Sequence, residues 1–143
     1  MPSSWSGLLA LQQATHATLA ALGHDLGDLA LSPAELNLLA SLSTGEQRTV
    51  SQLASDVGSR VTTVSGVLDR LERRGYVARK SHRTDRRALR IELTSSGRRI
   101  AARVRRSFDD LERRAFQDLS ARAIADFRRA LTALTEASAV TAT

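Results

Sequence analysis

The sequence predicts a mainly α-helical fold with a small β-wing, in which a winged helix-turn-helix lies between N- and C-terminal helices. Three observations predict it. Apolar residues recur at spacings of three and four over most of the chain, as in amphipathic helices. Two short segments with helix-start signals meet at Gly58. After Tyr76 the apolar period changes from about 3.6 to about 2, which is typical of a strand.

Two helices are expected before residue 47. The first has an apolar stripe and ends in the Gly- and Asp-rich stretch 23–28; the stripe is Leu8, Leu11, Thr15, Leu19, Leu22 and Leu26. The second begins at Ser32, because Pro33 suits a first helical turn and Glu35 completes a capping box with Ser32. It ends at residues 44–46, and its expected buried face is Leu36, Leu39 and Leu42.

The third helix is short and begins with a second capping box. Thr49 and Gln52 have the required spacing, and the side chains expected inside are Leu53, Ala54 and Val57. Gly58 then supplies a turn at positive φ.

A fourth helix begins at Ser59 or Arg60 and runs to about Arg74, where Gly75 closes it. Its helical wheel has an apolar side and an opposite polar side. The apolar side is Val64, Val67, Leu68 and Leu71, and the polar side is Thr62, Gly66, Asp69 and Arg73.

A β-hairpin, the wing, is expected next. In the second strand Leu89, Ile91 and Leu93 alternate with polar or small residues, as in a strand with one wet face. Residues 77–80 are its expected partner, and residues 81–87 form the polar tip.

Two helices complete the chain. One begins after residues 94–96, and its expected stripe is Ile100, Val104, Phe108, Leu111 and Ala115. The last begins at Ser120, and residues 136–143 are expected to fray because they are small and polar.

Charge divides the chain into three parts. Residues 1–47 have a net charge of −4, residues 48–106 of +11, and residues 107–143 of −1. A basic middle part is the electrostatic footprint of a nucleic-acid-binding surface. The 143 residues are expected to form a single domain, 1–143. The lack of cysteine, of a long apolar run and of a basic leader favours a cytoplasmic protein without a membrane span.

The fourth helix is expected to enter the major groove of double-stranded DNA, where its first turns reach base edges and later turns meet phosphate. Asp69 would be repelled by DNA unless a neighbouring arginine paired with it, so we expect it to orient that arginine. The wing tip would insert an arginine into the minor groove. The predicted DNA-binding residues are Thr49, Ser51, Gln52, Ser59, Arg60, Thr62, Thr63, Ser65, Gly66, Arg70, Arg73, Lys80, His82, Arg83, Asp85, Arg86 and Arg87.

The chain resembles the multiple antibiotic resistance regulator (MarR) family of winged-helix transcription factors. The matching stretches are Leu31–Glu35, Val50–Ala54, Leu68–Val77, Arg79, Asp85–Arg87 and Leu93–Arg98. The resemblance implies a homodimer on a pseudo-palindromic operator, often a repressor that a small molecule releases. It also implies that Arg87 is the DNA-contacting wing arginine and Asp85 its salt-bridge partner. Gly66 departs from the pattern, because many members have a larger polar or basic residue there.

The resemblance further implies that residues 1–30 and 95–140 hold the dimerisation helices, with the DNA-binding region at 31–94. The residues predicted at the dimer interface are Leu8, Leu11, Ile124, Phe127, Leu131 and Leu134. An anionic aromatic effector would bind where these helices meet the winged part.

Other functions remain as alternatives or are disfavoured. The winged helix could instead contact an acidic protein, or bind DNA without any effector. His16, His24 and His82 are too scattered for a metal site, and no cofactor is expected. No nucleophile elbow or paired carboxylate indicates an enzyme.

Overall fold

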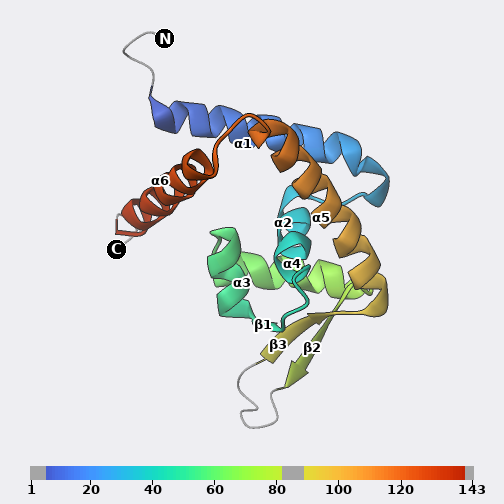
Figure 1. Ribbon diagram of the computed structural model, residues 1–143. Helices are drawn as coiled ribbons and strands as arrows, with labels where there is room; N and C mark the ends of the chain where they lie inside the picture. The colour runs from blue at the N-terminus through green and yellow to red at the C-terminus, as the bar shows by residue number, and fades with distance from the viewer. Residues whose placement is uncertain (1–5, 82–88, 141–143) are drawn as a thin grey trace. The chain divides into compact units, whose positions relative to one another are not determined.

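The computed structural model describes residues 6–81 and 89–140, the side chain of residue 140 excepted. It divides into two compact units, residues 1–109 and residues 110–143, which we describe separately. The helices and strands in chain order are α1 (Gly7–Asp25), the short 3-10 helix η1 (Gly27–Leu29), α2 (Pro33–Leu42), β1 (Arg48–Thr49), α3 (Val50–Val57), α4 (Val61–Arg73), β2 (Val77–Ser81), β3 (Leu89–Leu93), α5 (Ser95–Phe116) and α6 (Ala121–Val140) (Figure 1). The predicted fold class, mainly α with a small β-wing, is confirmed.

Both predicted capping boxes are present. The Ser32 hydroxyl accepts from the Glu35 amide at 3.2 Å, and the Glu35 carboxylate accepts from the Ser32 amide at 3.3 Å. Thr49 and Gln52 form the same reciprocal pair at 3.2 and 2.9 Å. Each box satisfies amides that the first turn of a helix leaves without partners, so the starts of α2 and α3 are fixed locally.

Glycines end α3 and α4. Gly58 and Gly75 have φ values of 66° and 77°. After α3, the Ser59 amide bonds the Ala54 carbonyl at 2.9 Å; after α4, the Tyr76 amide bonds the Leu71 carbonyl at 3.0 Å. These are Schellman closures, in which a left-handed residue lets the chain turn back over its own last carbonyls. The sharp turn between α3 and α4 follows from the first of them.

The core of the first unit lies where α2, α3, α4 and the sheet meet. Leu39, Leu53 and Leu68 are completely buried, one from each helix. The apolar side predicted for α4 is buried in full, and so is the predicted face of α2. Leu38 and Glu35 are buried on α2 as well, outside the face predicted from the helical spacing.

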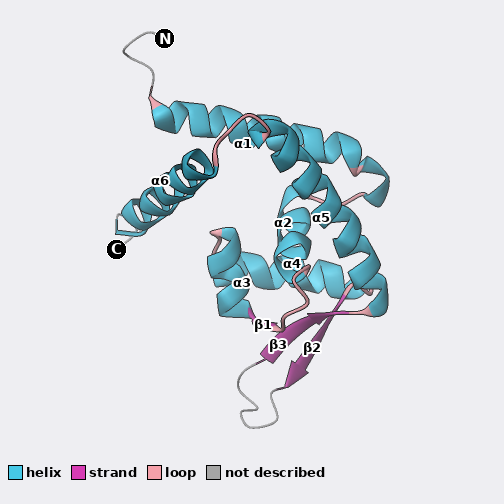
Figure 2. Ribbon diagram, in the orientation of Figure 1, coloured by secondary structure: helices cyan, strands magenta, loops and turns pink. Residues whose placement is uncertain are grey.

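The sheet has three antiparallel strands in the order β1-β3-β2. The two longer strands pair from Val77 opposite Leu93 to Ser81 opposite Leu89. Figure 2 shows β2 starting beside the end of α4 and β3 ending at the start of α5, while β1 lies next to α3. Leu89 is 45% exposed rather than inward, because it lies at the far end of the hairpin beyond the helices. The two-residue strand β1, which pairs with β3, was not predicted.

Helix α5 is where predicted, but its buried row differs. The buried residues are Gly97, Ala101, Val104 and Ser107, whereas Ile100, Phe108 and Leu111 are half-buried and Ala115 is exposed. Only Val104 of the predicted stripe is fully buried, because α5 presents its small residues to the core and so approaches it closely. Two polar links join α5 to the end of α1 and to η1: Ser107 donates to the Asp25 carboxylate of α1, and Arg103 bonds Asp28 of η1 at 2.7 and 3.0 Å.

The first half of α1 does not bury its stripe. Leu8 is 53% exposed and Leu11 is half-buried, whereas Leu22 and Leu26 are buried at the other end. An apolar stripe that the described residues of this unit leave exposed is a candidate surface for another partner.

The second unit contains the end of α5 and all of α6. The rings of Phe116 and Phe127 pack edge to face, with centroids 5.5 Å apart. Ser120 caps α6 by accepting from the Ala123 amide at 3.1 Å. The prediction that residues 136–143 fray is wrong for 136–140, which are helical. Phe127 and Leu134 are 43% and 37% exposed.

Candidate nucleic-acid interface

The recognition surface, as we call the polar side of α4 and its first turn, consists of Arg60, Thr62, Thr63, Ser65, Gly66, Asp69 and Arg73. Thr62, Thr63, Asp69 and Arg73 are exposed, and Ser65 and Gly66 are half-buried. Arg60 is the N-cap residue but makes no side-chain cap bond. The first two turns therefore present short side chains, with one long cation at the helix start.

Gly66 is not required by the fold. A Cβ placed on it would meet no atom of the described chain within 4 Å. Glycine inside a helix costs about 0.5–1 kcal/mol relative to alanine. The bare helix surface at Gly66 therefore lowers stability without improving the packing of this chain.

Three predicted contacts lie at the start of α3. Ser51 is exposed and available to a ligand. The side chains of Thr49 and Gln52 are already engaged with backbone amides in the capping box. They therefore act mainly on the position of α3, although their remaining polar atoms can still face a duplex.

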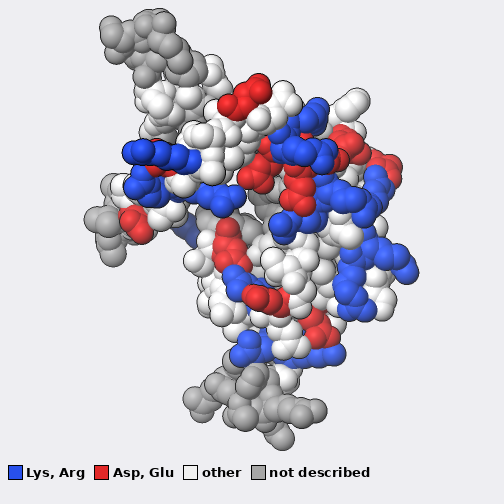
Figure 3. Space-filling view, in the orientation of Figure 1, with Lys and Arg blue, Asp and Glu red and all other residues white. Residues whose placement is uncertain are grey.

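The predicted partner of Asp69 is present, and it comes from β2 rather than from α4. The Arg79 guanidinium bonds Asp69 at 2.8 Å and Glu72 at 2.9 Å. It also donates to the Ser65 carbonyl at 3.4 Å. On the face drawn in Figure 3, Lys and Arg side chains likewise lie next to Asp and Glu side chains. The basic middle of the sequence is thus partly neutralised by its own carboxylates.

The two arginines predicted to meet phosphate are oriented by other groups. Arg70 lies 3.9 Å from the buried Glu35 carboxylate of α2, and Arg73 donates to the Asp69 carbonyl at 3.3 Å. The side chain of Arg70 is still 49% exposed. Both cations can therefore reach a phosphate without leaving α4.

Arg74 anchors the end of α4 to the turn before α2. It donates to the carbonyls of Leu29 and Ala30 at 2.6 and 2.8 Å, and lies 3.7 Å from Glu35. Its guanidinium also stacks 5.1 Å from the Tyr76 ring centre. Since Ala30 has a positive φ of 50°, these bonds hold a turn that alanine seldom adopts.

Of the predicted DNA contacts on the wing, Lys80 is the one that lies within the described residues. Its ammonium lies 2.5 Å from Glu92 on β3, and this contact, together with Gln47, lowers the pKa of the Glu92 carboxyl. The remaining predicted wing contacts lie outside the described residues: His82, Arg83, Asp85, Arg86 and Arg87.

Sequence reasoning missed three residues at this surface. Val61 is 47% exposed in the first turn of α4, and Arg79 forms the contacts given above. Arg90 lies opposite both Thr49 and Lys80 in the sheet, and its Nε is buried without a hydrogen bond to any of the described residues. Val61 was detectable, because it directly follows the helix cap and falls outside the apolar side. The roles of Arg79 and Arg90 depend on strand register, which the sequence alone does not give.

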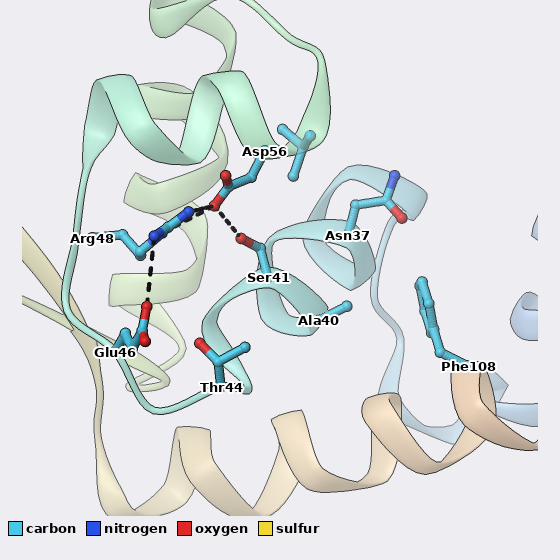
Figure 4. A pocket seen from close by; sticks show the side chains of 9 residues that line it. Asn37, Ala40, Ser41, Thr44, Glu46, Arg48, Asp56 and Phe108 are labelled. Atoms are coloured by element: carbon cyan, nitrogen blue, oxygen red, sulfur yellow. Dashed lines mark hydrogen bonds and ion pairs between the residues drawn. The ribbon is translucent and has the colours of Figure 1, made fainter. Parts of the chain in front are cut away.

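A hollow of about 520 Å³ lies between α2, α3 and α5 (Figure 4). Asn37, Ala40 and Ser41 of α2, Asp56 and Val57 of α3, and Phe108 of α5 line it together with Thr44, Glu46 and Arg48. Arg48 bonds Asp56 at 2.5 and 3.0 Å, and the Ser41 hydroxyl donates to the same carboxylate at 2.8 Å. The hydrogen bond from Arg48 is the largest cause that holds the pKa of Asp56 below its ordinary value; burial acts in the opposite direction.

Comparison with known proteins identifies this arrangement. Residues 31–89 match the model of the MarR family. This segment is similar to the winged helix-turn-helix of MarR-family proteins. The match spans the segment from just before α2 to the first residue of β3, which contains the whole recognition surface.

One curated relative and two solved structures illustrate the similarity to MarR-family proteins. The chain is 32% identical over 72 residues to the uncharacterized HTH-type transcriptional regulator YfiV of Bacillus subtilis (strain 168), across 50% of this chain and 45% of that protein, so it matches less than half of that relative. A MarR-family transcriptional regulator from Silicibacter pomeroyi is 25% identical, with a TM-score of 0.73 over 87% of this chain and 84% of the other. The S. aureus MepR–DNA complex is 21% identical, with a TM-score of 0.78 over 94% and 99%.

The described residues also bear on metal binding and on membrane insertion. Residues 6–81 and 89–140 contain no group of three or more His, Cys, Asp or Glu arranged to hold a metal ion. Within the same ranges no helix combines the length and apolarity needed to cross a membrane.

Proposed function

We propose that the protein is a sequence-specific regulator of transcription that binds double-stranded DNA, with α4 in the major groove. The recognition surface carries the proposal: its first two turns expose short polar side chains where a helix of this kind meets base edges. The same fold is bound to DNA in the MepR complex. The proposal assigns base contacts to the first turns and phosphate contacts to Arg70 and Arg73.

The DNA-binding region would be residues 31–94, and the regulator would act as a homodimer. The exposed apolar side chains of α1 and α6 support this, because Leu8, Phe127 and Leu134 are open to solvent in the single chain. Two recognition helices about 34 Å apart would then read the two halves of a pseudo-palindrome. Repression is the mode of action that the family resemblance favours. In this proposal the protein is not an enzyme. Its location would be cytoplasmic, because that is where it would meet the DNA it binds.

Selection of bound duplexes from a random-sequence pool tests the proposal. The parent protein should enrich one pseudo-palindromic sequence, the operator, and bind it about 10³-fold or more tightly than random DNA. Thr62→Ala should reduce this preference more than it reduces affinity for random DNA. Thr132→Ala, on exposed α6, is the matched control and should leave the preference unchanged. A pool with no enriched sequence would contradict the proposal.

The alternative is a winged helix that contacts an acidic protein. DNA binding releases counterions, so its affinity falls steeply with salt and depends on base sequence. Contact with an acidic protein would also weaken with salt but would show no preference among duplexes. Enrichment of one operator therefore decides between the two functions.

We further propose that the effector binds in the hollow of Figure 4. Among the described residues that line it, Arg48 is the one cation; it is bonded to Asp56 and lies 3.7 Å from Glu46. An anionic aromatic molecule would therefore have to compete with Asp56 for Arg48, and success would loosen the link between β1 and α3. A thermal-shift panel of small phenolic anions tests this, since a ligand that binds the native state raises the melting temperature. If no member of the panel shifts the melting temperature, or if Arg48→Gln leaves a shift unchanged, this site assignment is wrong.

A further inference from the structure

Arg79 joins the wing to the recognition helix. Strand alternation puts its side chain on the same face of β2 as the buried Val77, and this face is turned toward α4. Its acceptors, Ser65, Asp69 and Glu72, follow one another at spacings of four and three, so they form one stripe along α4. One guanidinium thus holds three groups over two turns of the helix.

The carboxylates are placed where they need this partner. Asp69 and Glu72 are 57% and 44% exposed on the helix that would approach phosphate, whereas the Arg79 side chain is only 27% exposed. Two uncompensated carboxylates there would repel a polyanion. Asp69 and Glu72 instead serve as hydrogen-bond acceptors that hold Arg79 of β2.

The position of Arg79 along β2 matters as well. Val77 fixes the start of the strand in the core, and Arg79 fixes it again two residues later. Ser81 is the last described residue before the basic segment 82–88. The bonds of Arg79 therefore set the direction in which β2 leaves α4.

We propose that Arg79 is a positioning residue of the DNA interface: by clamping Asp69, Glu72 and the Ser65 carbonyl, it fixes the wing relative to α4 and so determines operator preference. Arg79 itself need not contact DNA. This role rests on the proposed function. It adds the requirement that the wing be held in a fixed position relative to α4, which contact with phosphate alone would not impose.

The test compares Arg79→Lys and Arg79→Gln on the selected operator and on random DNA. Lysine keeps the charge but lacks the planar fork that bridges two carboxylates. Arg79→Lys should therefore retain random-DNA affinity within about twofold and lose about tenfold in the operator-to-random ratio, comparable with the loss of one good base contact. Arg79→Gln should lose the same ratio and also bind random DNA more weakly.

Controls separate positioning from folding and from charge. Arg105 pairs with the Asp109 carboxylate at 2.9 Å on α5. Arg105→Lys and Arg105→Gln are therefore the same changes made at another ion-paired arginine, outside the helix-turn-helix. They should leave the operator-to-random ratio at the parent value. Circular dichroism melting should show all four variants folded, because the carboxylates that pair with both arginines are exposed to solvent, and such pairs add little stability.

In the Arg79→Gln background, adding Asp69→Asn and Glu72→Gln removes the carboxylates. This triple change should restore random-DNA affinity but not the operator preference, because charge is repaired and the clamp is not.

Two results would overturn the proposal. One is an unchanged operator-to-random ratio in both Arg79 variants. The other is a uniform loss on all DNA with a salt slope smaller by about 0.9, which would make Arg79 a phosphate contact. A parent protein that shows no operator preference would instead contradict the proposed function.

Discussion

Gly97 shows how one residue joins two parts of the winged fold. A Cβ on Gly97 would lie 1.8 Å from the Tyr76 carbonyl oxygen, so α5 can start here only with glycine. The hydroxyl of Thr94, three residues before Gly97, donates a hydrogen bond to the Gly75 carbonyl at 2.6 Å and accepts one from the Gly97 amide at 3.0 Å. The Leu-Thr-x-x-Gly pattern in the sequence is therefore a packing motif between the end of α4 and the start of α5.

Gly97→Ala should destabilise the protein by about 1–3 kcal/mol, because the added methyl group must displace backbone rather than a flexible side chain. Chemical denaturation measures the change. Gly66→Ala is the matched control: its methyl group enters open space within a helix, so it should raise stability by about 0.5–1 kcal/mol. Equal effects from the two substitutions would contradict this account of Gly97.

Gly66→Ala should also weaken operator binding, even as it stabilises the fold. Its methyl group would stand on the polar side of α4, where the duplex is proposed to approach closely. Fluorescence anisotropy with the selected operator should show about a fivefold or greater loss, within the range expected for one impaired base contact. Parental affinity in a more stable variant would mean that the duplex does not approach α4 at Gly66.

At the scale of elements, the Arg48–Asp56 pair links β1 to α3, and Ser41 extends the link to α2. The folded pKa of Asp56 is lowered, mainly by Arg48, so the folded state holds this carboxylate ionised at pH values where the unfolded chain would protonate it. The stabilisation is therefore complete above about pH 4 and is lost as pH falls through the folded pKa. The pKa values of Asp28 and Glu92 are lowered too, so the stabilisation from these two carboxylates also falls as pH falls.

Asp56→Asn should be less stable than the parent at pH 7, and the difference should shrink as pH falls toward 3. Urea denaturation at several pH values measures both proteins. A difference that stays constant over this range would show that the charge of Asp56 does not contribute to stability through Arg48.

The elements were predictable wherever local chemistry fixes them. Ser32 with Glu35, Thr49 with Gln52, and Gly58 each specify a helix end through groups within a few residues. The buried row of α5 was not predictable by the same reasoning, because Gly97 and Ser107 are buried through close approach to distant parts of the chain and not through apolarity. The exposed residues of α4 could likewise be read from its helical period, whereas the Arg79 clamp depends on how β2 lies against α4.

At the scale of the whole molecule, dimerisation is the expectation that the apolar surface of α6 best supports. Leu134→Glu places a charge on that surface, where Leu134 is 37% exposed, so it should convert a dimer to a monomer at micromolar concentration. Thr132→Glu, an equally charged change at an exposed position on the same helix, should remain dimeric. Sedimentation velocity distinguishes these outcomes, and a monomeric parent would contradict the homodimer.

DNA recognition itself is tested most directly by titrating the protein with its selected operator and with random duplex over a range of salt concentrations. Our account predicts a linear, steeply negative log–log dependence of affinity on salt, together with a preference for the operator of about 10³-fold or more. Affinity that is flat in salt, or equal for the two duplexes at every salt concentration, would contradict it.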